Sequence, residues 1–575
     1  MSDSLSLTGA HWSLRDAKEP LVAELSAQLG IPKPLAQCMA SRGIETAQEG
    51  QLLLSPSASA FHDPFAMHGM QRAVERLNQA IEGGESIRAV TDYDVDGTTS
   101  SLILQGVLRI LGAKRLSYHI PNRMDEGYGF SIIAAEKAAE DGVNLIVTAD
   151  IGVKDHAAVD RAVELGVDVI ICDHHLPPDA DVPQNATVVL CPPQPTCSYP
   201  NPHLAACGVS FKLAQALLAE HPQKKAILRS LLKLAAIGTV ADVVDLRTPE
   251  NRSIVALGLQ ALNEGSHKPG LSALLRIAGV EVGELRSTDL GFRIGPRINA
   301  AGRMASATSV VELLTAPNPT RAREIADELE QMNKERRKIQ DQVLEQALQQ
   351  VPDPAPPVIL VAGEESKGWH RGITGIVAAR IRDRFHRPCA VISLGVDSGV
   401  ASVRSTPQVH AVEMLDSAAD LLEKYGGHPA AAGFSLKNDQ LEPLREQLCR
   451  AALEQTQGQI PPPERHADLR LEAHEINRAL FNELSRLEPY GKGNPSPRIW
   501  ISTTEIRDLR ILKEKHIKAR VGPAGRGLDC LWWGSAEHFE KLNQAKKVEL
   551  IGALSINRWR GRETLQMTID DVRLA

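Results

Sequence analysis

The chain has 575 residues, of which 43% are hydrophobic, so it is long enough for three or four domains with substantial cores. Its formal net charge of −7 argues against indiscriminate binding to nucleic acid, although a local basic surface remains compatible with that total. No uninterrupted apolar stretch reaches about 18 residues, and residues 1–10 lack the pattern of a secretory signal. We therefore expect no membrane span and no export.

The eight cysteines are scattered along the chain, without a CxxC pair. This usage favours reduced thiols in a cytoplasm over a disulfide framework. Cys191, Cys197, His203 and Cys207 lie close together, but their spacing matches no common zinc module and prolines surround them. We expect a loop there, with zinc as the weaker alternative.

Between about residues 86 and 190, short apolar runs alternate with amphipathic segments. The predicted strands are Ile87–Val90, Leu116–Ile120, Leu145–Thr148, Val167–Cys172 and Thr187–Leu190. Helices are predicted at Thr98–Leu111 and Ser131–Glu140, with Thr98, Thr99 and Ser131 as helix caps. The alternation is typical of an α/β fold built on a doubly wound parallel sheet.

A long helix is predicted over Arg321–Gln350. Its predicted apolar stripe is Ile325, Leu329, Met332, Ile339, Val343 and Ala347, and its predicted polar face is Lys334, Arg336, Arg337 and Lys338. That polar face is either simply solvated or in contact with nucleic acid. The proline-rich run 351–357 ends the helix, and a second α/β unit is expected to continue to about residue 454.

From Pro497 onward, strand patterns dominate. Five strands are predicted, at Arg498–Leu512, His516–Val521, Leu528–Trp533, Val548–Ile556 and Thr564–Val572, with a helical segment at Ser535–Leu542. Five strands with a helix between the third and fourth indicate an OB-like barrel. Four of the six tryptophans (Trp500, Trp532, Trp533 and Trp559) and many cations fall here, so single strands could stack and bind on it. We expect at least half of these tryptophans to be barrel core.

Carboxylates and imidazoles follow the predicted strands of the first unit. Asp92, Asp94 and Asp96 follow the first strand, and Asp173-His174-His175 follows the fourth. The carboxyl ends of parallel strands meet at one sheet edge, where ligands bind. Asp94 and Asp96, two residues apart, can face one side at a strand end.

Two further elements bring carboxylates to the same edge, because Asp150 follows the third strand and Asp242 follows the apolar run 234–240. Clustered carboxylates repel one another unless cations lie between them. Oxygen and nitrogen ligands together suit Mn²⁺ or Mg²⁺, and a phosphoester is the expected target. Each residue taken singly could be a cap or loop carboxylate, but that interpretation is weak for the whole set.

These residues resemble the DHH phosphoesterase superfamily, named for the Asp173-His174-His175 run. Residues 426–433 resemble the Gly-Gly-His motif of its DHHA1 domain, and further similar runs lie at 121–129, 238–242 and 297–303. With the barrel-like C-terminus, the chain resembles the RecJ-type single-strand-specific exonucleases from about residue 40 onward.

The resemblance implies a site with two metal ions, Mn²⁺ or Mg²⁺. The positions that match its metal ligands are Asp94, Asp96, Asp150, His174 and Asp242. His175 is implied as a further catalytic residue that contacts phosphate. Asp92 and Asp173 are either metal ligands themselves or residues that orient the ligands, and the second role is favoured. The implied substrate contacts are Arg123, Arg303, Arg404, Gly426, Gly427 and His428. Val90 is a departure, because many relatives have a histidine there, and one metal could be held more weakly.

The resemblance further implies a cytoplasmic 5′→3′ exonuclease for single-stranded DNA in repair and recombination, acting as a monomer, with single-strand-binding protein or a helicase as possible partners. The expected parts are an N-terminal segment (1–45), a DHH domain (46–320), a linker helix (321–350), a DHHA1 domain (351–460) and an OB-like domain (464–575). Alternatives are a nanoRNase, a cyclic-dinucleotide phosphodiesterase or an inorganic pyrophosphatase with related motifs, or a non-catalytic single-strand DNA-binding relative.

Overall fold

The computed structural model describes residues 5–121, 129–177, 181–304, 306–523, 525, 527–559 and 561–575. Main-chain contacts divide the chain into two compact units. The larger unit contains Leu14–Glu330 and Ala467–Asp570, and the smaller contains the residues up to Ser13, Gln331–His466 and Asp571–Leu574. None of the described helices is both long and apolar enough to cross a membrane.

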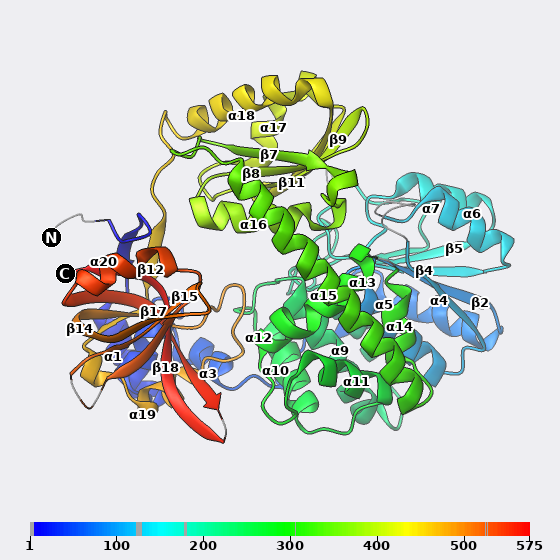
Figure 1. The fold of residues 1–575 in the computed structure, drawn as a ribbon. Helices are drawn as coiled ribbons and strands as arrows, with labels where there is room; N and C mark the ends of the chain where they lie inside the picture. Colours follow the sequence, from blue (N-terminus) through cyan, green and yellow to red (C-terminus); the bar gives the residue numbers. More distant parts are fainter. Residues whose placement is uncertain are drawn as a thin grey trace. The chain divides into compact units, whose positions relative to one another are not determined.

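The larger unit contains a five-stranded parallel sheet (Figure 1). Its strands are β2 (Ser86–Thr91), β3 (Arg115–His119), β4 (Leu145–Ala149), β5 (Asp168–Cys172) and β6 (Val188–Leu190). Their order in the sheet is β3-β2-β4-β5-β6, so the chain reverses its direction of travel between β2 and β4. The predicted doubly wound sheet is confirmed, and its switch point lies at the carboxyl ends of β2 and β4.

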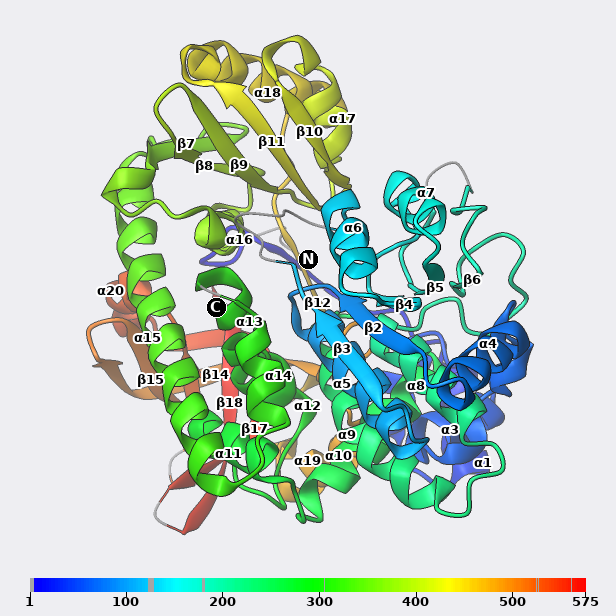
Figure 2. The same ribbon diagram turned by 90° about the vertical axis from the view of Figure 1, so that its right-hand side faces the viewer.

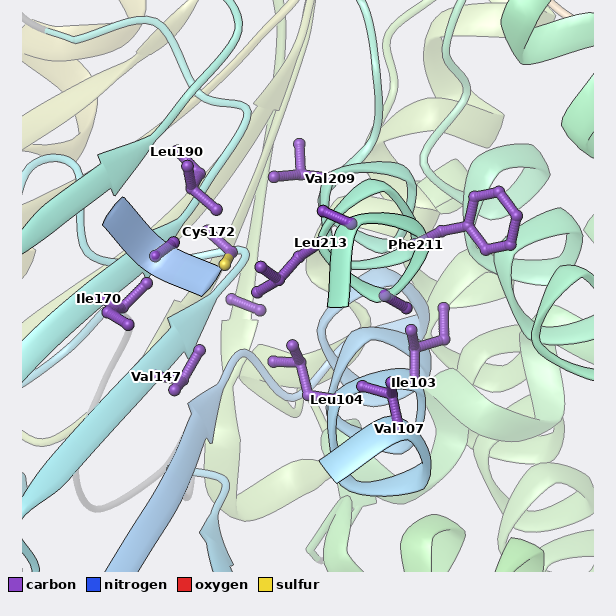
Figure 3. Packing of buried hydrophobic residues seen from close by; sticks show 14 of the residues in the cluster. Ile103, Leu104, Val107, Val147, Ile170, Cys172, Leu190, Val209, Phe211 and Leu213 are labelled. Carbon is purple, nitrogen blue, oxygen red and sulfur yellow. The ribbon is translucent and has the colours of Figure 1, made fainter. Parts of the chain in front are cut away.

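Helices cover both faces of this sheet because its strands are apolar on both sides. One face packs against α4 (Met70–Glu82), α5 (Val95–Ile110) and α8 (Ala206–Leu217), as in Figure 3, where Leu104 and Leu213 approach Val147 and Cys172. The other face packs against α6 (Ile132–Glu140) and α7 (His156–Glu164) through small and branched side chains. Figure 2 shows α6 and α7 on the side of the sheet opposite α8. Burial on both faces fixes the sheet in the middle layer.

Helix α5 begins earlier than predicted. Asp94 is its N-cap and accepts a hydrogen bond from the Gly97 amide at 3.1 Å, whereas Thr98 and Thr99 are buried inside the helix. The prediction that these threonines cap the helix was wrong, because an Asp was available one turn upstream. Ser131 does cap α6, accepting from the Ala134 amide.

Between the parallel sheet and Glu330, the larger unit is helical. These helices are α9 (Lys224–Ala241), α10 (Pro249–Asn263), α11 (Pro269–Ala278), α12 (Ser287–Asp289), α13 (Gly295–Met304), α14 (Thr308–Leu314) and the start of α15 (Pro319–Gln349). The N-terminal part adds α1 (Glu19–Leu29), α2 (Lys33–Ala40) and α3 (Ala47–Leu54).

Helix α15 confirms the predicted long helix, and most of its predicted apolar stripe is buried. Lys334, Arg337 and Lys338 are exposed as expected. Arg336 is not: it is 7% exposed and donates to Asn333 Oδ1 at 2.9 Å and to Gln340 Oε1 at 3.1 Å. Its place on the solvated face was predicted wrongly, because charge alone does not reveal a buried amide partner one helical turn away.

The smaller unit is built on a mixed five-stranded sheet of order β10-β11-β9-β8-β7, in which only β7 and β8 are parallel. Its elements are β7 (Ile359–Glu364), α16 (Arg371–Phe385), β8 (Cys389–Leu394), β9 (Ser398–Arg404), α17 (Ala411–Asp416), β10 (Lys424–His428), β11 (Ala431–Lys437) and α18 (Leu441–Gln455). Helix α16 covers one face, and α17 and α18 cover the other (Figure 1). The second predicted α/β unit is thus confirmed.

The N-terminal strand β1 (His11–Leu14) pairs with β12 (Glu464–Ala467). Trp12 Nε1 donates to Asp571 Oδ2 at 2.9 Å, which ties the two ends of the chain together within the smaller unit.

The C-terminal barrel contains β13 (Leu469–Leu471), α19 (Arg478–Ser485), β14 (Arg498–Leu512), β15 (His516–Val521), β16 (Leu528–Trp532), α20 (Phe539–Gln544), β17 (Lys547–Trp559) and β18 (Arg562–Leu574). Strand β14 pairs with both β15 and β17, which closes the five main strands into a barrel. Helix α20 lies between the third and fourth of these strands, so the OB-like prediction is confirmed.

Candidate metal centre

Acidic side chains gather at the switch point of the parallel sheet. Asp92, Asp94 and Asp96 follow β2, and Asp150 follows β4. His174 follows β5, and Asp242 is the C-cap of α9. The predicted metal-binding residues therefore come together from four elements, at the edge where an open parallel sheet binds ligands.

The ligand atoms lie close enough to share cations. In each of three groups, one ligand atom from every member lies within 4.8 Å of the others. The groups are Asp92, Asp94 and Asp150; Asp96, His174 and Asp242; and Asp150, His174 and His175. Among the described residues, no such group includes a cysteine, so the zinc alternative at residues 191–207 gains no support.

His174 lies between the carboxylates. Its Nε2 is 3.2 Å from Asp150 Oδ1 and 3.9 Å from Asp96 Oδ2, and its Nδ1 is 3.7 Å from Asp242 Oδ2. Nevertheless, the buried Nε2 atom makes no hydrogen bond within the described part of the chain. A ring nitrogen directed at carboxylate oxygens without a hydrogen bond is the arrangement expected when a cation joins them. The donor set therefore fits divalent metal ions with oxygen and nitrogen ligands.

The electrostatics support the same conclusion. Burial, followed by the charges of Asp94 and Asp96, raises the pKa of Asp150 well above its ordinary value. Burial and Asp96 also raise the pKa of Asp242 to about 7, and burial and Asp96 raise that of Asp94. Burial alone would lower the pKa of His174, but the surrounding carboxylates, Asp242 first, raise it. Without cations, the cluster thus retains protons that metal ions would displace.

Asp96 is held by a partner that the sequence did not reveal. It is 1% exposed, and its two oxygens accept from the amides of Ala206 at 2.7 Å and Cys207 at 2.9 Å. These amides open the 12-residue helix α8, whose N-terminus favours a negative charge. Asp96 is thereby fixed in orientation.

Asp173 holds the backbone of both histidines and the ring of His175. Its Oδ1 accepts from the amides of His174 and His175 and lies 2.8 Å from His175 Nδ1, while Oδ2 accepts from the Val153 amide. Burial would raise the pKa of Asp173, but the hydrogen bond and charge of His175 and the Val153 amide lower it to about 2. Asp92 lies within ligand reach of Asp94 and Asp150.

The backbone is strained where the site is built. Asp150 has φ +66° and Val243, directly after Asp242, has φ +60°, which is rare for a β-branched residue. Gly97 permits the sharp turn after β2, since a Cβ there would lie 2.3 Å from Asp92 O. Such strain persists only where the surrounding structure holds it.

The remaining predicted residues of the larger unit, Arg303, Arg123 and Val90, lie in different places. Gly302 packs on Tyr93, because a Cβ there would lie 2.7 Å from Tyr93 O, so Arg303 lies near the loop that carries the aspartates. Arg123 falls outside the described residues. Val90 is buried in the core beneath α6 and α7, and His119 of β3 lies beside it in register.

The predicted DHHA1 contacts lie in the smaller unit. His428, Ala431 and Arg404 are register partners across β10, β11 and β9, so His428 and Arg404 project from the same face of the sheet. Gly426 and Gly427 lie on the edge strand β10. Gly427 has φ +150°, and a Cβ there would lie 2.5 Å from Ala431 O, so the hairpin itself requires this glycine.

Barrel tryptophans divide between core and surface. Trp500 is 9% exposed and Trp532 is 5% exposed, so at least half of the four are core, as predicted. Trp533 is 58% exposed, and its ring lies 4.7 Å from that of His516.

Several barrel cations are engaged in ion pairs: Arg507 with Glu505, and both Lys518 and Arg520 with Asp529. Lys513 and Lys515, in the turn between β14 and β15, are exposed. They lie close in the chain to His516, whose ring contacts that of the exposed Trp533.

The raised pKa values predict a pH-dependent response to metal. In the metal-free protein, the unfolded chain ionises its aspartates near pH 4, whereas folded Asp242 holds its proton up to about pH 7. Stability should therefore fall as pH rises from about 4 to about 7, and Mn²⁺ should restore it increasingly over that window. Asp173 titrates below this window. Melting temperatures measured with and without Mn²⁺ at pH 5 to 8 test this prediction. A difference between the two melting temperatures that does not depend on pH would contradict it. In Asp242→Asn, that difference should vary less with pH than in wild type.

The fold and this centre define a protein of the DHH class with a DHHA1 domain. The family model of the DHH family, N-terminal domain, matches residues 86–239. The model of the DHHA1 domain matches residues 357–454, and that of the RecJ OB domain matches residues 467–571. These matches lie inside the domains predicted at 46–320, 351–460 and 464–575.

The single-stranded-DNA-specific exonuclease RecJ of Bacillus subtilis is 35% identical over 98% of this chain and 71% of its own length. The exonuclease of the same name from Escherichia coli is 34% identical, over 97% of this chain and 98% of its own. Crystalline RecJ from Thermus thermophilus in complex with Mn²⁺ superposes with a TM-score of 0.82 at 29% identity, covering 98% of this chain and 79% of that one. This chain belongs to the RecJ family.

Proposed function

We propose that this protein is a metal-dependent exonuclease that hydrolyses single-stranded DNA in the 5′→3′ direction, with a role in DNA repair and recombination. The observation that carries the proposal is the convergence of five aspartates and His174 at the switch point of the parallel sheet. Relatives named as single-stranded-DNA-specific exonucleases, similar over nearly the whole chain, support the substrate.

Asp94, Asp96, Asp150, His174 and Asp242 would hold two divalent ions, with Asp92 close enough to join them. Structures of RecJ from Thermus thermophilus are described in complex with Mn²⁺ and with Mg²⁺, which supports these ions as cofactors here. When bound, such ions supply an activated water, orient the phosphodiester and neutralise charge on the leaving oxygen.

The chain's own groups would position the substrate. Asp173 holds the His175 ring through Nδ1, which would orient the imidazole for contact with a phosphate oxygen. Arg303, beside the aspartate loop, would add a cation that can bind phosphate through two hydrogen bonds. In the smaller unit, Arg404, Gly426 and His428 are the proposed further contacts to the strand.

The closed barrel favours an exonuclease acting on long strands over a dinucleotide phosphodiesterase. The test is digestion of 5′- and 3′-labelled single strands, blunt duplexes and dinucleotides, with Mn²⁺, with Mg²⁺ and with a chelator. We expect release of mononucleotides from the 5′ end of single strands only. Equal rates on blunt duplex, or hydrolysis confined to dinucleotides, would refute the proposal.

We further infer that the enzyme acts as a monomer in the cytoplasm, where its eight free cysteines remain reduced. A helicase or a single-strand-binding protein would be a natural partner, because each exposes or covers the proposed substrate.

Replacing the exposed barrel residues Trp533, Lys513 and Lys515 should weaken binding to long single strands. We expect Trp533→Ala with Lys513→Ala and Lys515→Ala to weaken binding by at least ~10-fold, since stacking contributes about 1–3 kcal/mol per base. The dependence of log affinity on log salt should flatten by about 1.4, or about 0.7 for each lost phosphate contact. Binding titrations at several salt concentrations measure both effects. Lys541→Ala, at an exposed position on α20, is the control; an unchanged salt slope in the triple variant would exclude this surface.

A further inference from the structure

The segment Leu487–Asn494, which we call the anchored loop, runs between α19 and β14. It packs on the part of the larger unit that contains α9, α10 and α12. Ser287 Oγ donates to Tyr490 O at 2.6 Å, and the Leu246 amide donates to Lys492 O at 2.9 Å. Neither interaction is local in sequence, so the loop is part of the structure around the acidic centre.

Buried donors hold the base of the anchored loop. The guanidinium of Arg252, which is fully buried, donates to the carbonyl oxygens of Leu487 at 2.8 Å, Glu488 at 2.7 Å and Pro489 at 3.2 Å. Asn494, also fully buried, donates to Leu487 O and Pro489 O at 2.7 and 2.9 Å. A loop with this many satisfied carbonyls has little freedom to move.

The tip of the anchored loop is pressed against the segment that follows Asp242. A Cβ at Gly491 would lie 2.6 Å from Leu246 Cδ1, and a Cβ at Gly493 would lie 1.9 Å from Asp245 Oδ1. Gly493 also has φ +75°, a conformation that favours glycine. The two glycines therefore fix the backbone position of Lys492, which lies between them.

Lys492 is exposed at this tip, where its backbone carbonyl oxygen accepts from the amide of Leu246, which follows Asp242 closely in the chain. The tip therefore lies beside the segment that leaves the acidic centre. On the segment beneath, Asp245 is already paired with Arg247 at 2.6 Å. An acidic centre that must attract a polyanion gains from a fixed cation at its border.

We propose that Lys492 is a substrate-binding residue that contacts a phosphate of the strand held at the acidic centre. The anchored loop fixes the position from which its side chain reaches the strand, so less backbone freedom is lost when the contact forms. This inference rests on the proposed function, and it assigns a further substrate contact to a segment outside the DHH and DHHA1 matches.

The test compares Lys492→Met with wild type on a short single strand of about six nucleotides. We expect KM to rise three- to tenfold, kcat to stay within twofold, and the salt slope of log kcat/KM to flatten by about 0.7. Lys492→Arg should restore most of the loss because it keeps the charge. Lys225→Met is the matched control, since Lys225 is exposed at the opposite end of α9 from Asp242.

Mn²⁺ binding, measured by calorimetry, separates the possible failures. Lys492→Met should bind Mn²⁺ as wild type does, because the side chain is proposed to contact substrate and not metal. Unchanged KM and salt slope relative to Lys225→Met would overturn the proposal, and so would a fall in kcat with KM unchanged. If the wild-type protein itself digests no single strands, it is the proposed function that fails.

Discussion

Replacing Asp94 with Asn, or His174 with Ala, is expected to lower turnover on single-stranded DNA by at least ~100-fold while the fold stays intact. Asp94 belongs to one candidate metal group and His174 to two. Asn is the informative substitution at position 94, because it keeps the cap on α5 and removes only the charge. Rates should be measured at saturating Mn²⁺, alongside Mn²⁺ affinity and melting temperature.

The control for Asp94→Asn is Asp16→Asn, at an exposed position in the same unit. It makes the same change of charge away from the acidic centre and should leave turnover unchanged. Near-normal turnover by both Asp94→Asn and His174→Ala in added Mn²⁺ would rule out the assigned metal centre.

Replacing Arg252 with Met is expected to have the largest effect on stability, lowering the free energy of unfolding by at least about 3 kcal/mol. The Arg252 side chain is fully buried and donates to four carbonyl oxygens, those of Leu53, Leu487, Glu488 and Pro489. Each buried carbonyl left without a donor costs about 1–3 kcal/mol, and Met can fill part of the space but donates nothing.

Thermal and denaturant unfolding of the larger unit would measure this change. Arg247→Met is the matched control, because Arg247 is exposed and its ion pair among the described residues is with neighbouring Asp245, a contact worth at most about 1 kcal/mol. Equal destabilisation by the two substitutions would show that the buried carbonyl contacts of Arg252 contribute little. If Arg252→Met instead keeps the KM and salt slope of wild type, the anchored loop stays in place without Arg252.

The sequence alone determined the parts of the fold that depend on local patterns. Short β-branched runs such as Val169–Cys172 are apolar on both sides, so they can only be strands buried between helix layers, and the residues after them must lie at one edge. This is why Asp94, Asp150 and His174 could be assigned to a common site without a structure. The barrel followed similarly from five alternating runs and a single helix.

Only the tertiary structure decided which distant groups meet these residues. The amides of Ala206 and Cys207 hold Asp96 from more than a hundred positions away, and no local pattern encodes that pairing. Arg336 looked like a surface cation, but amide partners on its own helix accompany it into a buried position. Lys492 lies in a short polar loop whose sequence suggests only a turn. Periodicity reports which face of an element is buried, whereas the partner across that face is set by the packing of the whole chain.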